Sequence, residues 1–191
     1  MSKQALPLST LVAVIGAGAM GAGIAQVAAQ AGHPVRLLDN RPGAAEQAVA
    51  GIRAQLAKLA DKGRLTPEAA QAAAERLSAA ASNAELADAG LVIEAIVENL
   101  EVKRALFREL EAICGADCIF ATNTSSISVT AIAAGLRAPG RLVGMHFFNP
   151  APLMALVEVV SGLATNPAHA EAIHALAATW GKSPVHTRST P

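Results

Sequence analysis

Short apolar runs alternate with longer stretches of helical periodicity along the chain. The β-branched run at residues 11–15 stops at a glycine, and the run at residues 35–38 stops at Asp39. Runs of this length that end at glycine or at a charged residue predict buried strands. Between these two runs, apolar residues recur at helical spacing until Gly32, a residue type that commonly closes a helix. The chain therefore opens with a strand, a glycine-rich turn, a helix and a second strand, which together form one right-handed βαβ unit.

The same alternation continues along the rest of the chain. We expect helices at residues 99–113, at residues 128–134, and between the capping residue Asn166 and Gly181. The first of these helices is expected to pack through Val102, Leu106, Leu110 and Ile113. Further strands are expected at residues 91–96, 118–121, 142–145, 156–160 and 185–187.

Residues 44–80 are the least hydrophobic part of this pattern. They are rich in alanine and are interrupted by Gly63 and Pro67, so we expect two helices that form an arm. Strands that alternate with helices predict a parallel sheet with helices on both faces. The sequence thus predicts an α/β fold, a Rossmann-type doubly wound and mostly parallel sheet with a helical arm.

A glycine-rich turn with the sequence Gly-Ala-Gly-Ala-Met-Gly lies between the first strand and the first helix. In that position Gly16 permits a tight turn, Gly18 lets the backbone approach a pyrophosphate, and Gly21 lets the helix pack on the strand. The start of the helix offers free N–H groups and the positive end of its dipole to phosphates. Glycines that serve only the turn and its packing are the alternative interpretation. We favour a dinucleotide site that also includes Ala19 and Met20.

Asp39 lies at the end of the second strand, roughly 20 residues after the glycine turn. A carboxylate at this spacing binds the ribose hydroxyls of adenosine and repels a 2′-phosphate, which favours NAD over NADP. Arg41 is close enough in sequence to hold such a phosphate, and a solvated loop position is the interpretation that we prefer for it. NAD is therefore the expected cofactor.

Polar residues follow or interrupt the later strands. Ligands of a doubly wound sheet bind at the carboxyl ends of its strands, where we place Glu98, Asn123 and Ser125, and then His146. Imidazole exchanges protons near neutral pH, and Glu158, a carboxylate within an apolar strand, needs a nearby cation or donor if it is buried. The two residues are a candidate general base and its supporting carboxylate. The alternatives are a core role for His146 and capping or turn roles for Asn123 and Ser125.

Composition excludes several classes of function. Lys and Arg number 15, as do Asp and Glu, so no net charge attracts nucleic acid or an anionic membrane. Hydrophobic residues make up 52% of the chain, enough for a folded core. No apolar run approaches a membrane span, and residues 1–10 lack the core of a signal peptide, so a cytoplasmic protein is expected. Cys114 and Cys118 match no zinc or redox spacing, which predicts two buried thiols and no metal site.

Five segments together carry a family resemblance. They are residues 14–26 around the glycine turn, residues 92–99, residues 123–126, residues 146–150 and residues 156–159. In this order and spacing the chain resembles the 3-hydroxyacyl-CoA dehydrogenases, and the sequence His-Phe-Phe-Asn-Pro is the most specific part of the match. The resemblance implies an NAD-dependent oxidoreductase with an acyl-CoA substrate of the 3-hydroxybutyryl-CoA or 3-hydroxyadipyl-CoA type.

The resemblance also implies roles for individual residues. His146 corresponds to the general base that takes the 3-hydroxyl proton as hydride leaves C3 for the nicotinamide, and Glu158 to the carboxylate that orients it. Ser125 corresponds to a residue that hydrogen-bonds the reacting oxygen of the substrate, and Asn149 to one that helps to place substrate and cofactor. Cofactor contacts are also expected from Glu98, Lys103 and Asn123, and CoA contacts from Lys62 and Ser125.

Members of this family continue into an all-helical domain that supplies most of the dimer interface and closes over the acyl chain. We therefore expect residues 1–191 to be the NAD-binding domain, without that helical domain, and the full-length protein to be a homodimer. Such a chain is expected to bind NAD but to turn over poorly. Two alternatives stay open: a dehydrogenase with a catalytic lysine, such as a β-hydroxyacid dehydrogenase, and a crystallin-like structural protein without turnover.

Overall fold

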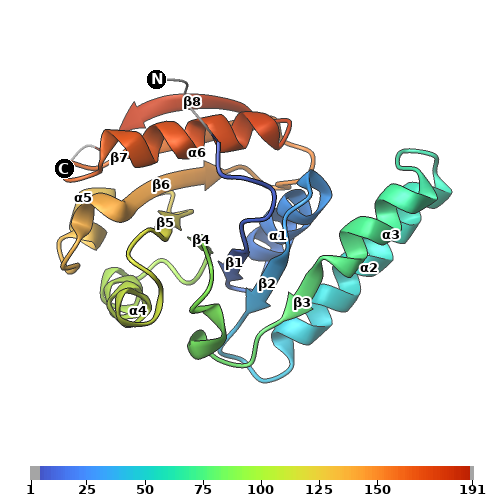
Figure 1. Cartoon of the computed structure of the whole chain (residues 1–191), viewed down its shortest axis with the longest axis horizontal. Coiled ribbons are helices and arrows are strands. Elements are labelled where there is room, and N and C mark those ends of the chain that lie inside the picture. The colour runs from blue at the N-terminus through green and yellow to red at the C-terminus, as the bar shows by residue number, and fades with distance from the viewer. Residues whose placement is uncertain (1–4, 190–191) are drawn as a thin grey trace.

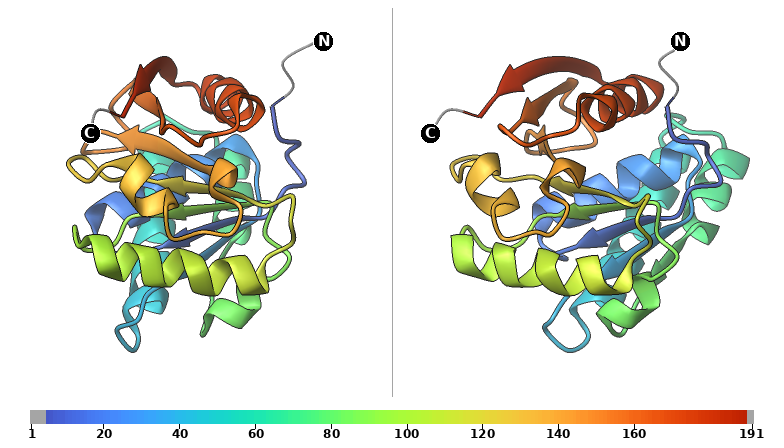
Figure 2. Two further views of the ribbon diagram at one scale, coloured as in Figure 1. Left: turned by 90° about the vertical axis from the view of Figure 1, so that its left-hand side faces the viewer. Right: turned by 60° about the vertical axis from the view of Figure 1, so that its left-hand side comes forward.

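The computed structural model describes residues 5–189. Within them the strands form one eight-stranded sheet in the order β3-β2-β1-β4-β5-β6-β7-β8. Helices cover both of its faces (Figures 1 and 2). The strands are β1 Val12–Ile15, β2 Val35–Leu38, β3 Leu77–Ala79, β4 Leu91–Glu94, β5 Ile119–Thr122, β6 Leu142–Phe147, β7 Leu156–Ser161 and β8 Ser183–Arg188.

Neighbouring strands run parallel at every junction except that between β6 and β7, which is antiparallel. The predicted doubly wound and mostly parallel sheet is therefore confirmed. The chain proceeds from β1 to β2 and β3 on one side and returns to β4 on the other side of β1. Ligands of such sheets bind where the strand order reverses in this way, beyond the carboxyl ends of the strands.

The helices follow the predicted order. Gly32, with a φ of 119°, ends α1, and the side chain of Asn166 caps the start of α6. The helices α2 and α3 lie side by side and project from the sheet as the predicted arm (Figure 1). The bounds are α1 Ala19–Ala31, α2 Ala44–Asp61, α3 Pro67–Glu75, α4 Leu100–Ile113, α5 Val129–Ala133 and α6 Pro167–Thr179, with single 3-10 turns at Asn83–Leu86 and Pro139–Arg141.

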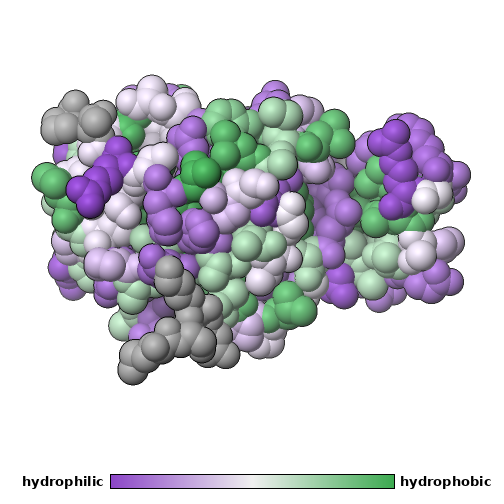
Figure 3. Space-filling view, turned by 90° about the horizontal axis from the view of Figure 1, so that it is seen from above, coloured by the Kyte–Doolittle hydropathy of each residue, from purple (hydrophilic) through white to green (hydrophobic). Residues whose placement is uncertain are grey.

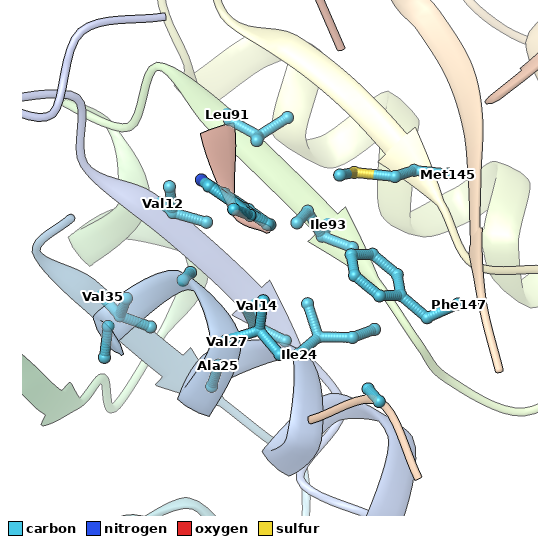
Figure 4. Packing of buried hydrophobic residues seen from close by; sticks show 14 of the residues in the cluster. Val12, Val14, Ile24, Ala25, Val27, Val35, Leu91, Ile93, Met145 and Phe147 are labelled. Atoms are coloured by element: carbon cyan, nitrogen blue, oxygen red, sulfur yellow. The ribbon is translucent and has the colours of Figure 1, made fainter. Parts of the chain in front are cut away.

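The central strands are buried on both faces, because alternate residues belong to two different cores. Val12 and Val14 of β1 pack with Ile24 of α1 in the larger core (Figure 4). Ala13 and Ile15 belong to a second core that includes residues of α4 and α5. Two-sided burial explains why these strands are continuous apolar runs in the sequence.

The structure corrects three expectations. The short strand β3 pairs with β2 at the end of a segment that we expected to be helical through residue 80. The predicted inner face of α4 is only partly right: Leu110 is buried as expected, but Lys103 and Phe107 are buried while Val102 is exposed. Periodicity alone cannot separate an apolar side chain that faces the core from one that faces a ligand cleft. His146 lies within β6 and does not follow it.

The outer surface mixes polar and apolar side chains. In the space-filling view from above, apolar and polar residues are interspersed over the region of α6 and β8 (Figure 3). Cys114 and Cys118 are both buried and unpaired thiols, as predicted. Among residues 5–189, no helix has the length and apolar character needed to cross a membrane.

Candidate active site

The glycine turn joins β1 to α1 through three glycines with different constraints. Gly16 has a φ of 108°, which L side chains rarely adopt, and a Cβ there would overlap the carbonyl oxygen of Ala95. A Cβ on Gly21 would overlap the carbonyl oxygen of Gly16. A Cβ on Gly18 would meet nothing within 4 Å. Gly16 and Gly21 are therefore required by the fold, whereas the bare backbone of Gly18 leaves room for a ligand.

The start of α1 is open to an anion. Its N-cap is Gly18, which has no side chain to occupy the free N–H groups of the first turn, and Ala19 and Met20 are the first two helical residues. Free N–H groups and the positive end of the helix dipole form a site for phosphate. The turn therefore fits the pyrophosphate of a dinucleotide.

Asp39 faces the turn from the end of β2. Its Oδ2 accepts a hydrogen bond from the N–H of Ala17 (2.8 Å), and its Oδ1 accepts from the N–H (2.8 Å) and the Nε (3.1 Å) of Arg41. Burial alone would raise the pKa of Asp39, but these hydrogen bonds outweigh it and the pKa lies below its ordinary value. The Arg41 side chain is 68% exposed yet paired with Asp39, so it is not the purely solvated residue that we expected.

Two cavities meet beside the turn. The larger, about 940 Å³, is lined by Gly16, Gly18 and Asp39, and the smaller, about 320 Å³, is lined by Met20 and by residues of the later strands. Both cavities include Ala95 and its neighbour in the loop after β4. Because Asp39 suits the ribose of adenosine, the larger cavity fits the adenosine half of a dinucleotide, and the smaller one fits the other half.

His146 and Glu158 meet at the edge of the smaller cavity. They are directly opposite each other in the antiparallel pair of β6 and β7, and Nδ1 of His146 lies 3.7 Å from Oε2 of Glu158. The predicted pairing is present, but Glu158 is not the buried carboxylate that we expected, because its side chain is 34% exposed. The His146 side chain is 18% exposed and packs against the ring of Phe148. Since Nδ1 faces Glu158, Nε2 is the nitrogen that a substrate can use.

Three other predicted residues line the same cavity. Asn123 lies after β5, and its Oδ1 accepts a hydrogen bond from the N–H of Phe147 (2.8 Å), which ties the loop to β6. Ser125 and Asn149 are exposed and line the cavity together with His146. Their side chains are thus available to a small molecule in the cavity.

A buried lysine joins two carboxylates at the base of this cavity. Nζ of Lys103 lies 2.5 Å from Oε2 of Glu94 and 3.1 Å from Oε1 of Glu98. Oε1 of Glu94 accepts a hydrogen bond from Oγ1 of Thr122 (2.6 Å). Glu98 and Lys103 both line the cavity, but Lys103 is fully buried and its ammonium is engaged by the carboxylates.

Lys62 is the predicted site residue that lies apart from the others. It is exposed and caps the end of α2 at the outer turn of the arm, and it lines neither cavity beside the glycine turn. A contact between Lys62 and a substrate would therefore involve a part of the ligand that extends along the arm.

Two buried or half-buried polar residues were missed by the sequence interpretation. Glu94, which is fully buried, is the residue that makes a buried Lys103 possible. The signal for it was a carboxylate at the end of an apolar strand. Lys182 donates hydrogen bonds to the carbonyl oxygens of Ala151 (2.6 Å) and Met154 (2.8 Å) and so fastens the loop that follows Asn149. No sequence pattern points to that contact, because its partners are backbone carbonyls.

Comparison with known proteins adds to this geometry. Residues 11–190 match the family model described as 3-hydroxyacyl-CoA dehydrogenase, NAD binding domain. The chain belongs to this family. It is 52% identical to the 3-hydroxyadipyl-CoA dehydrogenase of Escherichia coli K12 over 180 aligned residues. These residues make up 94% of this chain and 38% of that protein. It is 44% identical to a probable 3-hydroxybutyryl-CoA dehydrogenase of Bacillus subtilis, over 94% of this chain and 63% of that protein.

Solved structures agree with the assignment to this NAD-binding domain family. A crystal structure of 3-hydroxybutyryl-CoA dehydrogenase from Escherichia coli K12 aligns with a TM-score of 0.94 at 51% identity, over 97% of this chain and 39% of that one. NAD is the cofactor of this domain family, and the glycine turn and Asp39 fit it. The chain spans between about two fifths and two thirds of the length of these relatives. These relatives bear the names of dehydrogenases, which does not favour the crystallin-like alternative.

Proposed function

We propose that this chain carries the hydride-transfer chemistry of an NAD-dependent 3-hydroxyacyl-CoA dehydrogenase. The reaction interconverts the C3 hydroxyl group of a 3-hydroxyacyl-CoA and the corresponding keto group. The observation that supports the proposal is the His146–Glu158 pair, 3.7 Å apart, at the cavity that remains for the nicotinamide once adenosine is assigned to the Asp39 side. In this proposal His146 is the proton acceptor beside the carbon that loses hydride.

The pair supplies the acid–base half of the reaction. NAD, when bound, accepts the hydride from C3. Nε2 of His146 takes the hydroxyl proton, and the carboxylate of Glu158 on the Nδ1 side stabilises the imidazolium that results. Ser125 donates a hydrogen bond to the reacting oxygen, and Asn149 orients the substrate against the cofactor. In the reverse direction the imidazolium returns the proton to the keto oxygen.

The cofactor contacts follow from the two cavities. The N–H groups at the start of α1 hold the pyrophosphate, and Asp39 holds the adenosine ribose. Glu98, Lys103 and Asn123 form the nicotinamide end. We further propose that Gly16, Gly18, Ala19, Met20 and Gly21 act through their backbone, with Gly21 contributing by packing alone.

The substrate is an acyl-CoA, and the names of the relatives support 3-hydroxybutyryl-CoA or 3-hydroxyadipyl-CoA as its type. In this proposal Lys62 contacts the CoA moiety from the arm. A homodimer of the full-length protein, a cytoplasmic location and the absence of nucleic-acid and membrane partners stay predictions. Weak turnover by residues 1–191 alone stays a prediction as well.

The alternative of a catalytic lysine has little geometric support. Lys103 is the lysine that lines the smaller cavity, and its ammonium lies between Glu94 and Glu98. Its ammonium is already engaged by two carboxylates and faces them instead of the open cavity. His146 is therefore the better candidate for the base.

The test follows NADH absorbance with acetoacetyl-CoA for the wild type and for His146→Ala. We expect His146→Ala to lower turnover by about 10²- to 10⁴-fold, because general acid–base catalysis contributes about that much. NADH binding, measured by fluorescence, should be retained. His186→Ala, at an exposed histidine of β8, is the matched control and should turn over like the wild type.

Two outcomes would reject the proposal. Equal and measurable turnover by wild type and His146→Ala would mean that another group moves the proton. NADH binding without turnover, in a protein extended to the full length of the relatives, would favour the crystallin-like alternative. A panel of 3-hydroxyacyl-CoA substrates, including a dicarboxylic one, would then separate the two substrate types.

A further inference from the structure

The Glu94–Lys103–Glu98 cluster contains one more carboxylate than ammonium group. Lys103 and Glu94 are fully buried and pair with each other, while the Glu98 side chain is 40% exposed. With its formal charges the cluster carries one net negative charge. The exposed part of that charge is the carboxylate of Glu98, which lines the smaller cavity together with Met20 and His146.

The Glu98 carboxylate is held in place. Its Oε2 accepts hydrogen bonds from the hydroxyls of Thr124 (2.7 Å) and Ser126 (2.9 Å), and its Oε1 faces Lys103. Burial alone would raise the pKa of Glu98, but the hydrogen bonds and the charge of Lys103 lower it below the ordinary value, so the group is ionised at neutral pH. Glu98 also precedes Asn99, the N-cap of α4, where the positive end of the helix dipole favours a carboxylate.

A fixed charge at this place acts on only one half of the dinucleotide. The adenosine half is assigned to the larger cavity by Asp39, so the nicotinamide half belongs to the smaller cavity. Oxidised nicotinamide carries a positive charge and reduced nicotinamide does not, whereas the adenosine and pyrophosphate parts are the same in both. An anion at the nicotinamide end therefore interacts differently with the two oxidation states.

We propose that Glu98, fixed by Lys103, Thr124 and Ser126, shifts the cofactor preference of this domain toward the oxidised form, NAD⁺, relative to NADH. The inference rests on the NAD-binding part of the proposed function and not on its acyl-CoA chemistry. His146 also lines the cavity and pairs with Glu158, but both residues stay the same when only Glu98 is changed. One charge that is partly exposed to solvent changes an affinity by roughly fivefold to tenfold.

The experiment measures the dissociation constants of both cofactor forms for the wild type and for Glu98→Gln. NADH binding is followed by fluorescence, and NAD⁺ binding by competition with NADH. Glutamine keeps the size of the side chain and leaves the buried Glu94–Lys103 pair neutral. We expect the dissociation constant of NAD⁺ to rise about fivefold to tenfold and that of NADH to change by less than about twofold.

Glu109→Gln is the matched control. Glu109 lies on α4, the helix that begins just after Glu98, and it is exposed and lines the larger cavity, so the same loss of charge occurs at the adenosine end. It should change both dissociation constants by the same factor. A second measurement needs no variant: because Glu98 is partly exposed, added salt should weaken NAD⁺ binding by the wild type more than NADH binding.

An unchanged ratio of the two dissociation constants in Glu98→Gln would overturn the inference. If that variant failed to fold, a wild-type ratio independent of salt would overturn it instead. These measurements contain no acyl-CoA. A chain that binds both cofactor forms but fails to turn over would therefore count against the proposed function and not against the role of Glu98.

Discussion

At the scale of single residues, the proposed site makes the choice of cofactor depend on the Asp39–Arg41 pair. Asp39→Ala removes the proposed acceptor for the ribose hydroxyls and at the same time frees the guanidinium of Arg41. We expect the dissociation constant of NAD to rise by at least about tenfold, since hydrogen bonds to charged groups contribute about 1.5–3 kcal/mol. Binding of NADP should improve, because the freed Arg41 can face a 2′-phosphate.

Titration with NADH and NADPH, followed by fluorescence, measures both effects. Glu46→Ala is a suitable control, since Glu46 lines the same cavity without a hydrogen bond to the turn among those found for residues 5–189. Should Asp39→Ala retain wild-type NAD affinity, another group must hold the ribose.

The partial exposure of the Glu158 carboxylate affects how much it contributes to the stability of the protein. Removing one partner of a buried ion pair costs about 3–5 kcal/mol of stability, but an exposed pair contributes about 1 kcal/mol or less. With 34% of its side chain exposed, Glu158 belongs nearer the second case. We expect Glu158→Gln to change the free energy of unfolding by less than about 1 kcal/mol while turnover falls by about tenfold or more. Denaturant unfolding and the NADH assay measure the two quantities, and a large loss of stability with normal turnover would contradict this assignment.

At the scale of elements, two glycines in the turn between β1 and α1 have different roles. We expect Gly21 to be needed for folding and Gly18 for binding. Gly21→Ala places a Cβ on the carbonyl oxygen of Gly16, so we expect it to destabilise the protein by about 1–3 kcal/mol or more. Gly18→Ala meets no protein atom within 4 Å, so stability should stay close to that of the wild type. The added methyl group would instead stand where the pyrophosphate approaches, and NADH binding should weaken strongly.

Thermal unfolding and NADH titration of the two variants check this contrast. Gly51→Ala is a control within α2, because a Cβ there also meets nothing within 4 Å and the residue lies outside both cavities. Normal cofactor binding by Gly18→Ala would show that the open space at that residue is not used by the ligand.

The same element shows what the sequence could predict. A strand, three glycines at fixed spacing and a helix are local features, so the turn and its partner Asp39 were predictable. The inner face of α4 was only partly predictable, because Val102 lines the larger cavity and a buried Lys103 is tolerable only through Glu94 on a neighbouring strand. That pairing and the short strand β3 both depend on which strands are adjacent in the sheet. The periodicity of apolar residues along the chain cannot predict this adjacency.

At the scale of the whole molecule, the two halves of the sheet are joined around Trp180, the single tryptophan of the chain. Its ring, at the end of α6, stacks on Phe147 of β6, the strand that carries His146, and meets the edge of His33, which follows α1. Nδ1 of His33 in turn lies 3.1 Å from the carbonyl oxygen of Thr10. The glycine-turn half and the His146–Glu158 half of the site therefore share one buried contact.

This contact makes stability depend on pH. Burial lowers the pKa of His33, and the nearby charge of Arg76 lowers it further, although the hydrogen bond with Thr10 acts in the opposite direction. In the neutral ring Nδ1–H donates to Thr10, and Nε2 is buried without a hydrogen-bond partner among residues 5–189. Protonation would add a buried N–H donor there with nothing to accept it. The folded state therefore resists protonation more than the unfolded state does.

The sign of the effect follows from the lowered pKa. Below about pH 6.5 the unfolded chain binds a proton at His33 that the folded chain does not, so stability is full above that pH and falls as the pH drops toward the folded-state pKa. The slope for one group is at most about 1.4 kcal/mol per pH unit.

We expect the temperature at the midpoint of thermal unfolding, followed by Trp180 fluorescence, to decrease as the pH is lowered from 7.5 to 5.5. His33→Gln should flatten that dependence, whereas His174→Gln, at a partly exposed histidine of α6, should leave it unchanged. If both variants kept the wild-type slope, the acid sensitivity would belong to other groups, and the contact around Trp180 would join the halves of the site without coupling them to pH.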